Sequence, residues 1–252
     1  MVHKIHRETS GVYIIAATPF TDSGAVDHDS ARRMVDFYIG HGVAGLTILG
    51  MMGEANKLTA EERRALIDTV VARAGNTPVV VGVSDAGLAN LVDLGRYAMD
   101  RGAAGLMIAP NAGPAREDRI EAYFHAVCNA LGPDIPIVFQ DFPLATGLPV
   151  SPALIRRLSQ SLDQIVMLKH EDWPGLGKIS ELRAQENASG VRRLSILVGN
   201  GGLYLPQELQ RGADGAMTGF AYPEALVQTV VLHRAGKVDE AEDLFDRYIP
   251  IL

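Results

Sequence analysis

Lys169 is the residue whose position says most about possible chemistry. It closes the apolar run Ile165–Lys169, which predicts a buried side-chain stem and an amine at the end of a strand. Burial disfavours the charged form of an amine, and a neutral amine can attack a ketone to form a Schiff base. Lys169 is therefore a candidate nucleophile. The alternative is a structural lysine that pairs with Glu171 or Asp172.

Several polar residues accompany Lys169 at predicted strand ends. Asp141 follows the fifth predicted strand, and His170, Glu171 and Asp172 follow the sixth. These acids and the imidazole could surround a cation, but their spacing matches no diagnostic metal motif. We therefore predict no metal site and take Asp141, His170 and Glu171 as candidates for proton transfer.

Glycine-rich loops supply candidate substrate contacts. Gly50–Glu54 is bracketed by two glycines, which let backbone N–H groups approach a carboxylate closely. Two further glycine-rich segments follow or frame the last two predicted strands, Gly199–Gly202 and Gly212–Gly219. In (β/α)8 barrels this region commonly binds phosphate. An enzyme acting on a phosphorylated substrate is therefore an open alternative, although neither loop contains a lysine or an arginine. The candidate substrate-binding residues are Gly50, Met51, Met52, Gly199, Asn200 and Met217.

The elements that must position these residues alternate along the whole chain. Short β-branched or apolar runs are followed by longer segments with apolar residues at helical spacing. The eight runs are Val12–Ala17, Gly45–Leu49, Val79–Val83, Gly105–Ala109, Ile135–Gln140, Ile165–Lys169, Ser195–Gly199 and Gly215–Thr218. The helical segments are Asp27–His41, Thr59–Ala74, Leu88–Arg101, Arg116–Leu131, Pro152–Ser161, Gly175–Glu186, Leu203–Arg211, Pro223–Arg234 and Val238–Tyr248.

Eight strand–helix units favour a TIM (β/α)8 barrel, in which the loops after the strands form the active face. The alternative is an open parallel sheet with two sub-domains. No linker or low-complexity segment interrupts the pattern, so we expect one barrel domain over residues 1–252.

Composition restricts the class of protein. Hydrophobic residues make up 47% and charged residues 21% of the 252, as in an ordinary globular chain. The net charge of −7 argues against nucleic-acid binding, and Cys128 is the single cysteine, which excludes an intramolecular disulfide. Met1–Ser10 lacks an apolar signal sequence, and no apolar run is long enough to cross a membrane. We expect a cytoplasmic protein.

These residues together resemble the dihydrodipicolinate synthase/N-acetylneuraminate lyase family of class I aldolases. The resemblance extends from Gly11 to about Tyr248. It rests on Thr18-Pro19-Phe20, Gly50-Met51-Met52-Gly53-Glu54, Pro143 with Gly147, Lys169 on the sixth strand, and Gly212–Thr218.

The resemblance implies that Lys169 forms an imine with pyruvate or the 2-oxo group of a longer acid. That imine would act as the electron sink for aldol cleavage, condensation or dehydration, without a separate cofactor. The substrate carboxylate would be held by backbone N–H groups of the loop that contains Met51 and Met52. The resemblance also implies a homo-oligomer, a dimer or a tetramer, and a helical extension after the barrel that is reduced or absent in this sequence.

Departures from the family pattern affect proton transfer. Family members have hydroxyl residues where Met51 and Met52 stand, and a tyrosine that relays protons where Gln140 stands. Gln140 is a candidate catalytic residue, but an amide cannot titrate, so it can only position a carbonyl or a water. A second relay tyrosine corresponds to Ala112, and an arginine that binds the second substrate corresponds to Ala145.

The leading interpretation is a lyase that forms a Schiff base at Lys169. An alternative is a paralogue that binds a 2-oxo acid without turnover. The methionines suggest a substrate other than aspartate semialdehyde.

Overall fold

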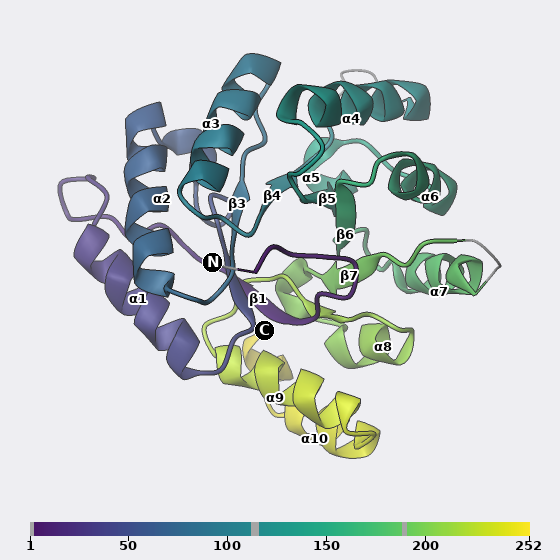
Figure 1. Ribbon diagram of the computed structural model, residues 1–252. Coiled ribbons are helices and arrows are strands. Elements are labelled where there is room, and N and C mark those ends of the chain that lie inside the picture. Colours follow the sequence, from purple (N-terminus) through teal and green to yellow (C-terminus); the bar gives the residue numbers. More distant parts are fainter. Residues whose placement is uncertain (1–2, 112–115, 188–190) are drawn as a thin grey trace.

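A computed structural model describes residues 3–111, 116–187 and 191–252. Eight parallel strands close into a barrel, in which β1 pairs with both β2 and β8 (Figure 1). The strands are β1 (Gly11–Ile15), β2 (Gly45–Ile48), β3 (Val79–Gly82), β4 (Gly105–Ile108), β5 (Ile137–Asp141), β6 (Ile165–His170), β7 (Ser195–Val198) and β8 (Gly215–Ala216). Closure between β1 and β8 excludes the open sheet and confirms the predicted TIM barrel.

Helices surround the barrel in chain order (Figure 1). They are α1 (His28–Gly40), α2 (Ala60–Ala74), α3 (Leu88–Asp100), α4 (Glu117–Leu131), α5 (Pro143–Thr146), α6 (Pro152–Ser161), α7 (Leu176–Glu186), α8 (Leu205–Gln210), α9 (Pro223–Arg234) and α10 (Val238–Asp246). In the described residues, three short 3-10 turns complete the list: Ala55–Lys57, Asn200–Gly202 and Ile249–Ile251. α8 is shorter than the helix predicted at 203–211, because the 3-10 turn Asn200–Gly202 occupies the chain just before it.

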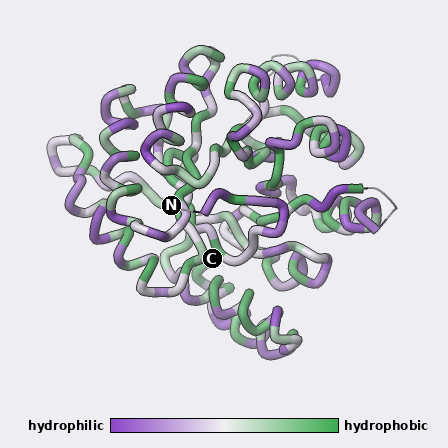
Figure 2. The backbone as a smooth tube through the Cα atoms, viewed as in Figure 1, coloured by the Kyte–Doolittle hydropathy of each residue, from purple (hydrophilic) through white to green (hydrophobic). Residues whose placement is uncertain are grey.

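The strands bury side chains on both faces. Successive strand residues point to opposite sides, so one set fills the barrel and the other packs under the helices. Tyr13, Val80, Met107, Val138 and Met167 belong to the interior cluster, whereas the larger cluster lies between the strands and the helices. Along each helix, hydrophobic and hydrophilic stretches alternate (Figure 2), as expected when one helix face covers a barrel and the other faces water.

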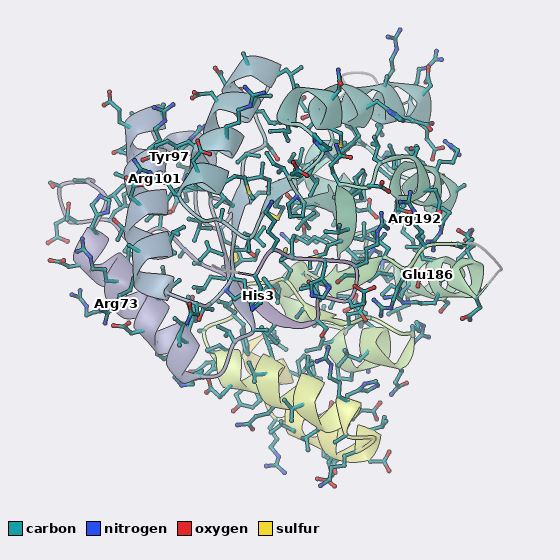
Figure 3. All side chains as sticks on the ribbon, in the orientation of Figure 1. His3, Arg73, Tyr97, Arg101, Glu186 and Arg192 are labelled. Atoms are coloured by element: carbon teal, nitrogen blue, oxygen red, sulfur yellow. The ribbon has the colours of Figure 1, made fainter. Side chains whose placement is uncertain are left out.

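Local signals in the sequence explain how helices begin and pack. Thr59 and Glu62 form the capping box that starts α2, with both reciprocal hydrogen bonds present. Farther along this helix, Arg73 donates two hydrogen bonds to Asp36 of α1. Arg101 lies over the ring of Tyr97, 4.9 Å from its centroid, on the same outer layer (Figure 3). The Arg73–Asp36 pair joins α2 to α1, whereas the Arg101–Tyr97 contact lies at the C-terminal end of α3.

The single cysteine and the lengths of the helices bear on two expectations from the sequence. Cys128 is buried in α4, and burial raises the pKa of its thiol to about 12, so it behaves as a small apolar side chain. No helix in the described part of the chain has the length and apolarity needed to cross a membrane.

Candidate active site

A pocket of about 190 Å3 opens at the carboxyl end of the barrel. The β5 and β6 strands contribute Gln140 and Lys169, and the chain just beyond β6 contributes Glu171. The other residues that line it are Ile15, Met51, Met52, Phe142, Asn200, Gly201, Thr218 and Gly219. Loops after the strands thus form the pocket, as the barrel architecture predicts.

Lys169 is buried, with 4% of its surface exposed, yet it lines this pocket. Its Nζ lies 3.0 Å from Oε2 of Glu171, which is itself only 7% exposed. The sequence left open whether Lys169 is a buried nucleophile or a structural lysine that pairs with an acid. In the structure Lys169 is both buried at the pocket and paired with Glu171. Proton transfer from the ammonium to this carboxylate would leave a neutral amine inside the pocket.

Gln140 completes this group from the neighbouring strand. Gln140 and Lys169 are partners in the register of β5 and β6, so both side chains point into the barrel. The amide Nε2 of Gln140 donates a 2.8 Å hydrogen bond to Oε2 of Glu171. Gln140 thus positions the carboxylate that lies beside the amine.

Asp141 and His170, the other proton-transfer candidates, do not line the pocket. They alternate with Gln140 and Lys169 along the strands and therefore point outward, toward the helices. Asp141 is fully buried and accepts a 2.8 Å hydrogen bond from Nζ of Lys178 in α7. The Nδ1 of His170 is 3.7 Å from Asp141. This geometry indicates that the pair stabilises the packing of α7 and does not contact a substrate.

The loop after β2 combines a strained backbone position with open backbone donors. Leu49 adopts a positive φ of 55°, a conformation that is strained for a leucine and typical of functional loops. Thr18 fixes the loop through a 2.6 Å hydrogen bond from its hydroxyl to the carbonyl of Gly53. Among the hydrogen bonds of the described residues, none is donated by the backbone N–H of Met51 or Met52. These two donors are available beside the pocket.

The predicted substrate contacts divide into two groups. Met51, Met52 and Asn200 line the pocket, whereas Gly50, Gly199 and Met217 are not among the lining residues. Met217 is fully buried in the barrel interior.

Gly199 instead adjoins Glu171. A Cβ at this position would overlap the Glu171 side chain and lie 2.6 Å from its Oε1. Gly199 therefore provides the space that the buried carboxylate occupies.

Ile15 and Phe142 line the pocket but lie outside the residues and loops that the sequence indicates, whereas Gly201, Thr218 and Gly219 belong to the predicted loops Gly199–Gly202 and Gly212–Gly219. Strand alternation could have identified Phe142, which lies two residues after Gln140. Ala112, where the family has a relay tyrosine, lies outside the described residues. Ala145, where the family has an arginine, is exposed on α5.

Neither metal nor phosphate binding gains support from the pocket. Within the described ranges, no group of three or more His, Cys, Asp or Glu side chains could hold a metal ion. Of the described residues that line the pocket, Lys169 is the only basic one, and it is already paired with Glu171. A phosphate dianion would find no second cation there.

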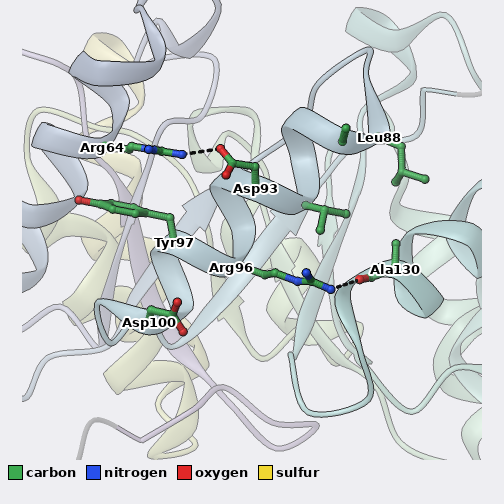
Figure 4. A pocket seen from close by; sticks show the side chains of 9 residues that line it. Arg64, Leu88, Asp93, Arg96, Tyr97, Asp100 and Ala130 are labelled. Atoms are coloured by element: carbon green, nitrogen blue, oxygen red, sulfur yellow. Dashed lines mark hydrogen bonds and ion pairs between the residues drawn. The ribbon is translucent and has the colours of Figure 1, made fainter.

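A larger hollow of about 880 Å3 lies on the outer surface, along α3 and its neighbours α2 and α4 (Figure 4). Three of its charged groups are engaged with one another or with the backbone. Arg64 pairs with Asp93, and Arg96 donates to the carbonyl of Ala130. This groove contains none of the candidate catalytic residues.

Comparisons with known proteins agree with the fold. The family described as the dihydrodipicolinate synthetase family matches residues 8–252. A crystal structure of dihydrodipicolinate synthase from Rhodopseudomonas palustris has 46% sequence identity and a TM-score of 0.96, covering 99% of this chain and 83% of that one.

Two curated relatives differ in their named activities. The 4-hydroxy-tetrahydrodipicolinate synthase of Methanothrix thermoacetophila is 32% identical over 247 residues, which are 96% of this chain and 80% of that protein. The L-2-keto-3-deoxyarabonate dehydratase of Azospirillum brasilense is 30% identical over 247 residues, 96% of this chain and 78% of that protein. The chain therefore belongs to the dihydrodipicolinate synthetase family, which confirms its assignment as a lyase of this type.

Proposed function

We propose that Lys169 forms a Schiff base with pyruvate or another 2-oxo acid and that the chain catalyses aldol cleavage, condensation or dehydration through this imine. The observation that carries the proposal is the placement of Nζ. This amine is buried, lines a small pocket and has a carboxylate 3.0 Å away to receive its proton. Burial and an adjacent base are two of the means by which proteins activate an amine as a nucleophile.

The loop after β2 would hold the substrate carboxylate. The N–H groups of Met51 and Met52 supply donors that need no side-chain hydroxyl, so methionines at these positions do not prevent carboxylate binding. The imine itself supplies the electron sink, so the proposed reaction requires no separate cofactor.

The apolar lining limits the part of the substrate beyond the 2-oxo acid. Ile15, Met51, Met52 and Phe142 form much of the pocket wall, and Met51 and Met52 are each 52% exposed at its mouth. A charged tail would lose its hydration there without gaining a counter-ion. The proposed reaction partner is therefore uncharged beyond the reacting carbonyl, unlike aspartate semialdehyde.

Turnover by a Lys169→Ala variant tests this function against a role in binding alone. Cleavage and condensation would be assayed with pyruvate plus uncharged and anionic aldehydes, and dehydration with 3-deoxy-2-oxo acids. We expect activity that the substitution abolishes while the far-ultraviolet circular dichroism and melting temperature remain near those of the unsubstituted chain. Activity that survives in a folded Lys169→Ala variant would refute the covalent mechanism. If the unsubstituted chain itself shows no activity with any of these substrates, the binding role is favoured.

A further inference from the structure

The carboxylate of Glu171 has a position that the Schiff base alone does not explain. Met167, Lys169 and Glu171 alternate along one strand direction and point into the barrel. The backbone N–H of Glu171 donates to the carbonyl of Asp141 at 2.8 Å, which extends the β5–β6 ladder by one residue. The sheet itself therefore places the carboxylate beside Lys169.

Three neighbours hold Glu171 in this place. Gln140 donates to Oε2, the oxygen that lies 3.0 Å from Nζ of Lys169. The amide of Asn200 donates to the main-chain carbonyl of Glu171 at 3.2 Å. On the remaining side, the missing Cβ of Gly199 leaves room for the side chain. A buried carboxylate is costly unless it is paired and hydrogen-bonded, and this one is both.

No other described residue that lines the pocket carries a carboxyl, imidazole or phenol group. Gln140 stands where the family has its relay phenol, and an amide cannot take up a proton at neutral pH. Glu171 is therefore the group within reach of the imine that can both accept and donate a proton.

We propose that Glu171 carries the protons of the Schiff-base reaction, in place of a tyrosine relay. This inference rests on the proposed imine at Lys169. Glu171 first takes a proton from the Lys169 ammonium, and the neutral amine then attacks C2 of the 2-oxo acid. The resulting carbinolamine receives the proton from Glu171 on its hydroxyl, water leaves, and a protonated imine remains next to the carboxylate.

The same carboxylate then acts on carbon. Glu171 removes a proton from C3, and the electron pair of that C–H bond moves through C2 to the imine nitrogen, which gives an enamine. When the enamine attacks an aldehyde, Glu171 returns the proton to the new alkoxide oxygen. Cleavage follows these steps in reverse. Each proton taken is given back, and no oxidant or reductant is needed.

Exchange of the pyruvate methyl protons in D2O, followed by nuclear magnetic resonance, tests this proposal. The variant is Glu171→Gln, which keeps the shape but cannot titrate. The matched control is Glu208→Gln, which alters a buried glutamate of α8 that does not line the pocket. We expect the first to lose at least about 100-fold in exchange rate, within the usual range for acid–base catalysis, and the second to retain it.

Borohydride trapping of the same samples separates this proposal from the proposed function. The Glu171→Gln variant should still accumulate the reduced pyruvate adduct on long incubation. Exchange near the unsubstituted rate in a variant that forms the adduct would overturn the role of Glu171 and leave the Schiff base intact. If the folded Glu171→Gln variant forms no adduct at all, Glu171 serves to position Lys169, and its proposed role as the proton carrier is overturned. No adduct in the unsubstituted chain would overturn both proposals.

A second variant guards against misfolding. Glu171→Asp keeps the acid but shortens the side chain, so exchange should lie between that of the unsubstituted chain and that of Glu171→Gln. Its pH dependence should retain a rising limb that reports ionisation of the carboxyl, and Glu171→Gln should lose this limb. A pH profile unchanged in both variants would contradict the proposal.

Discussion

Gln140 lies opposite Lys169 in the register of β5 and β6, and both side chains contact Oε2 of Glu171. One carboxylate oxygen thus joins the residue that replaces the family's tyrosine to the residue that would form the imine. The three side chains form one unit, and a change in any of them should alter the positions of the other two.

Replacing Gln140 tests whether this unit has been built around an amide. Gln140→Tyr restores the family's residue but removes the hydrogen bond to Glu171 and adds a ring to a small pocket. A hydrogen bond to a charged group contributes about 1.5–3 kcal/mol, so we expect kcat to fall by roughly 10- to 150-fold. Steady-state kinetics would check this, with Gln140→Leu showing the loss of the amide alone. An increase in kcat for Gln140→Tyr would mean that the pocket only lacks the tyrosine that relays protons and has not been built around the amide.

Gly199 allows a test that leaves the three side chains unchanged. In Gly199→Ala the new Cβ would displace the carboxylate of Glu171. Because misplacement of a reacting group by about 1 Å can cost about 100-fold, we expect a loss of that order in kcat. Gly177→Ala in α7 is the matched control, since a Cβ there meets no atom within 4 Å. Equal kinetics for both variants would show that the position of Glu171 is unimportant.

The outward-facing side chains of Asp141, His170 and Lys178 should affect stability and not catalysis. Lys178→Met leaves the fully buried Asp141 without its cation, which typically costs about 3–5 kcal/mol in the free energy of unfolding. Urea denaturation would measure this loss, and Asp141→Asn in the same chain should recover part of it. Lys237→Met removes an exposed pair with Glu240 and should cost no more than about 1 kcal/mol. If the folded Lys178→Met variant had a greatly reduced kcat, Asp141 would need a catalytic role.

The buried carboxyl of Glu208 should make the free energy of unfolding depend on pH. Burial raises its pKa from 4.5 to about 8, so the folded state retains a proton that the unfolded state loses. Between these two pH values the unfolded state binds fewer protons, and stability therefore falls by about 1.4 kcal/mol for each pH unit. Glu208→Gln removes this dependence. In urea unfolding, the variant should gain on the unsubstituted chain at pH 8.5 and match it near pH 4.5. A constant difference would contradict this assignment.

The sequence predicted the barrel more completely than the site. Glycine turns and apolar runs are local signals, and every predicted strand is present in the structure. The short helix α5 was not predicted, because four residues are too few to show helical periodicity. Burial of Lys169 followed from its apolar run, but its pairing with Glu171 and Gln140 depends on the register between strands.

Strand alternation could have reduced the list of proton-transfer candidates. If Lys169 points into the barrel, Glu171 does as well and His170 points away, and the same rule separates Gln140 from Asp141. The role of Gly199 could not be predicted in this way. Its neighbour Glu171 follows a different strand, and the need for space appears only when the two chain segments are placed together.

Trapping of the imine tests the central claim most directly. The chain would be incubated with pyruvate or other 2-oxo acids, reduced with borohydride, digested, and analysed by mass spectrometry. We predict a reduced adduct on the peptide that contains Lys169 and no adduct in Lys169→Ala. A lack of adduct with every 2-oxo acid, or an adduct confined to another lysine, would contradict the account.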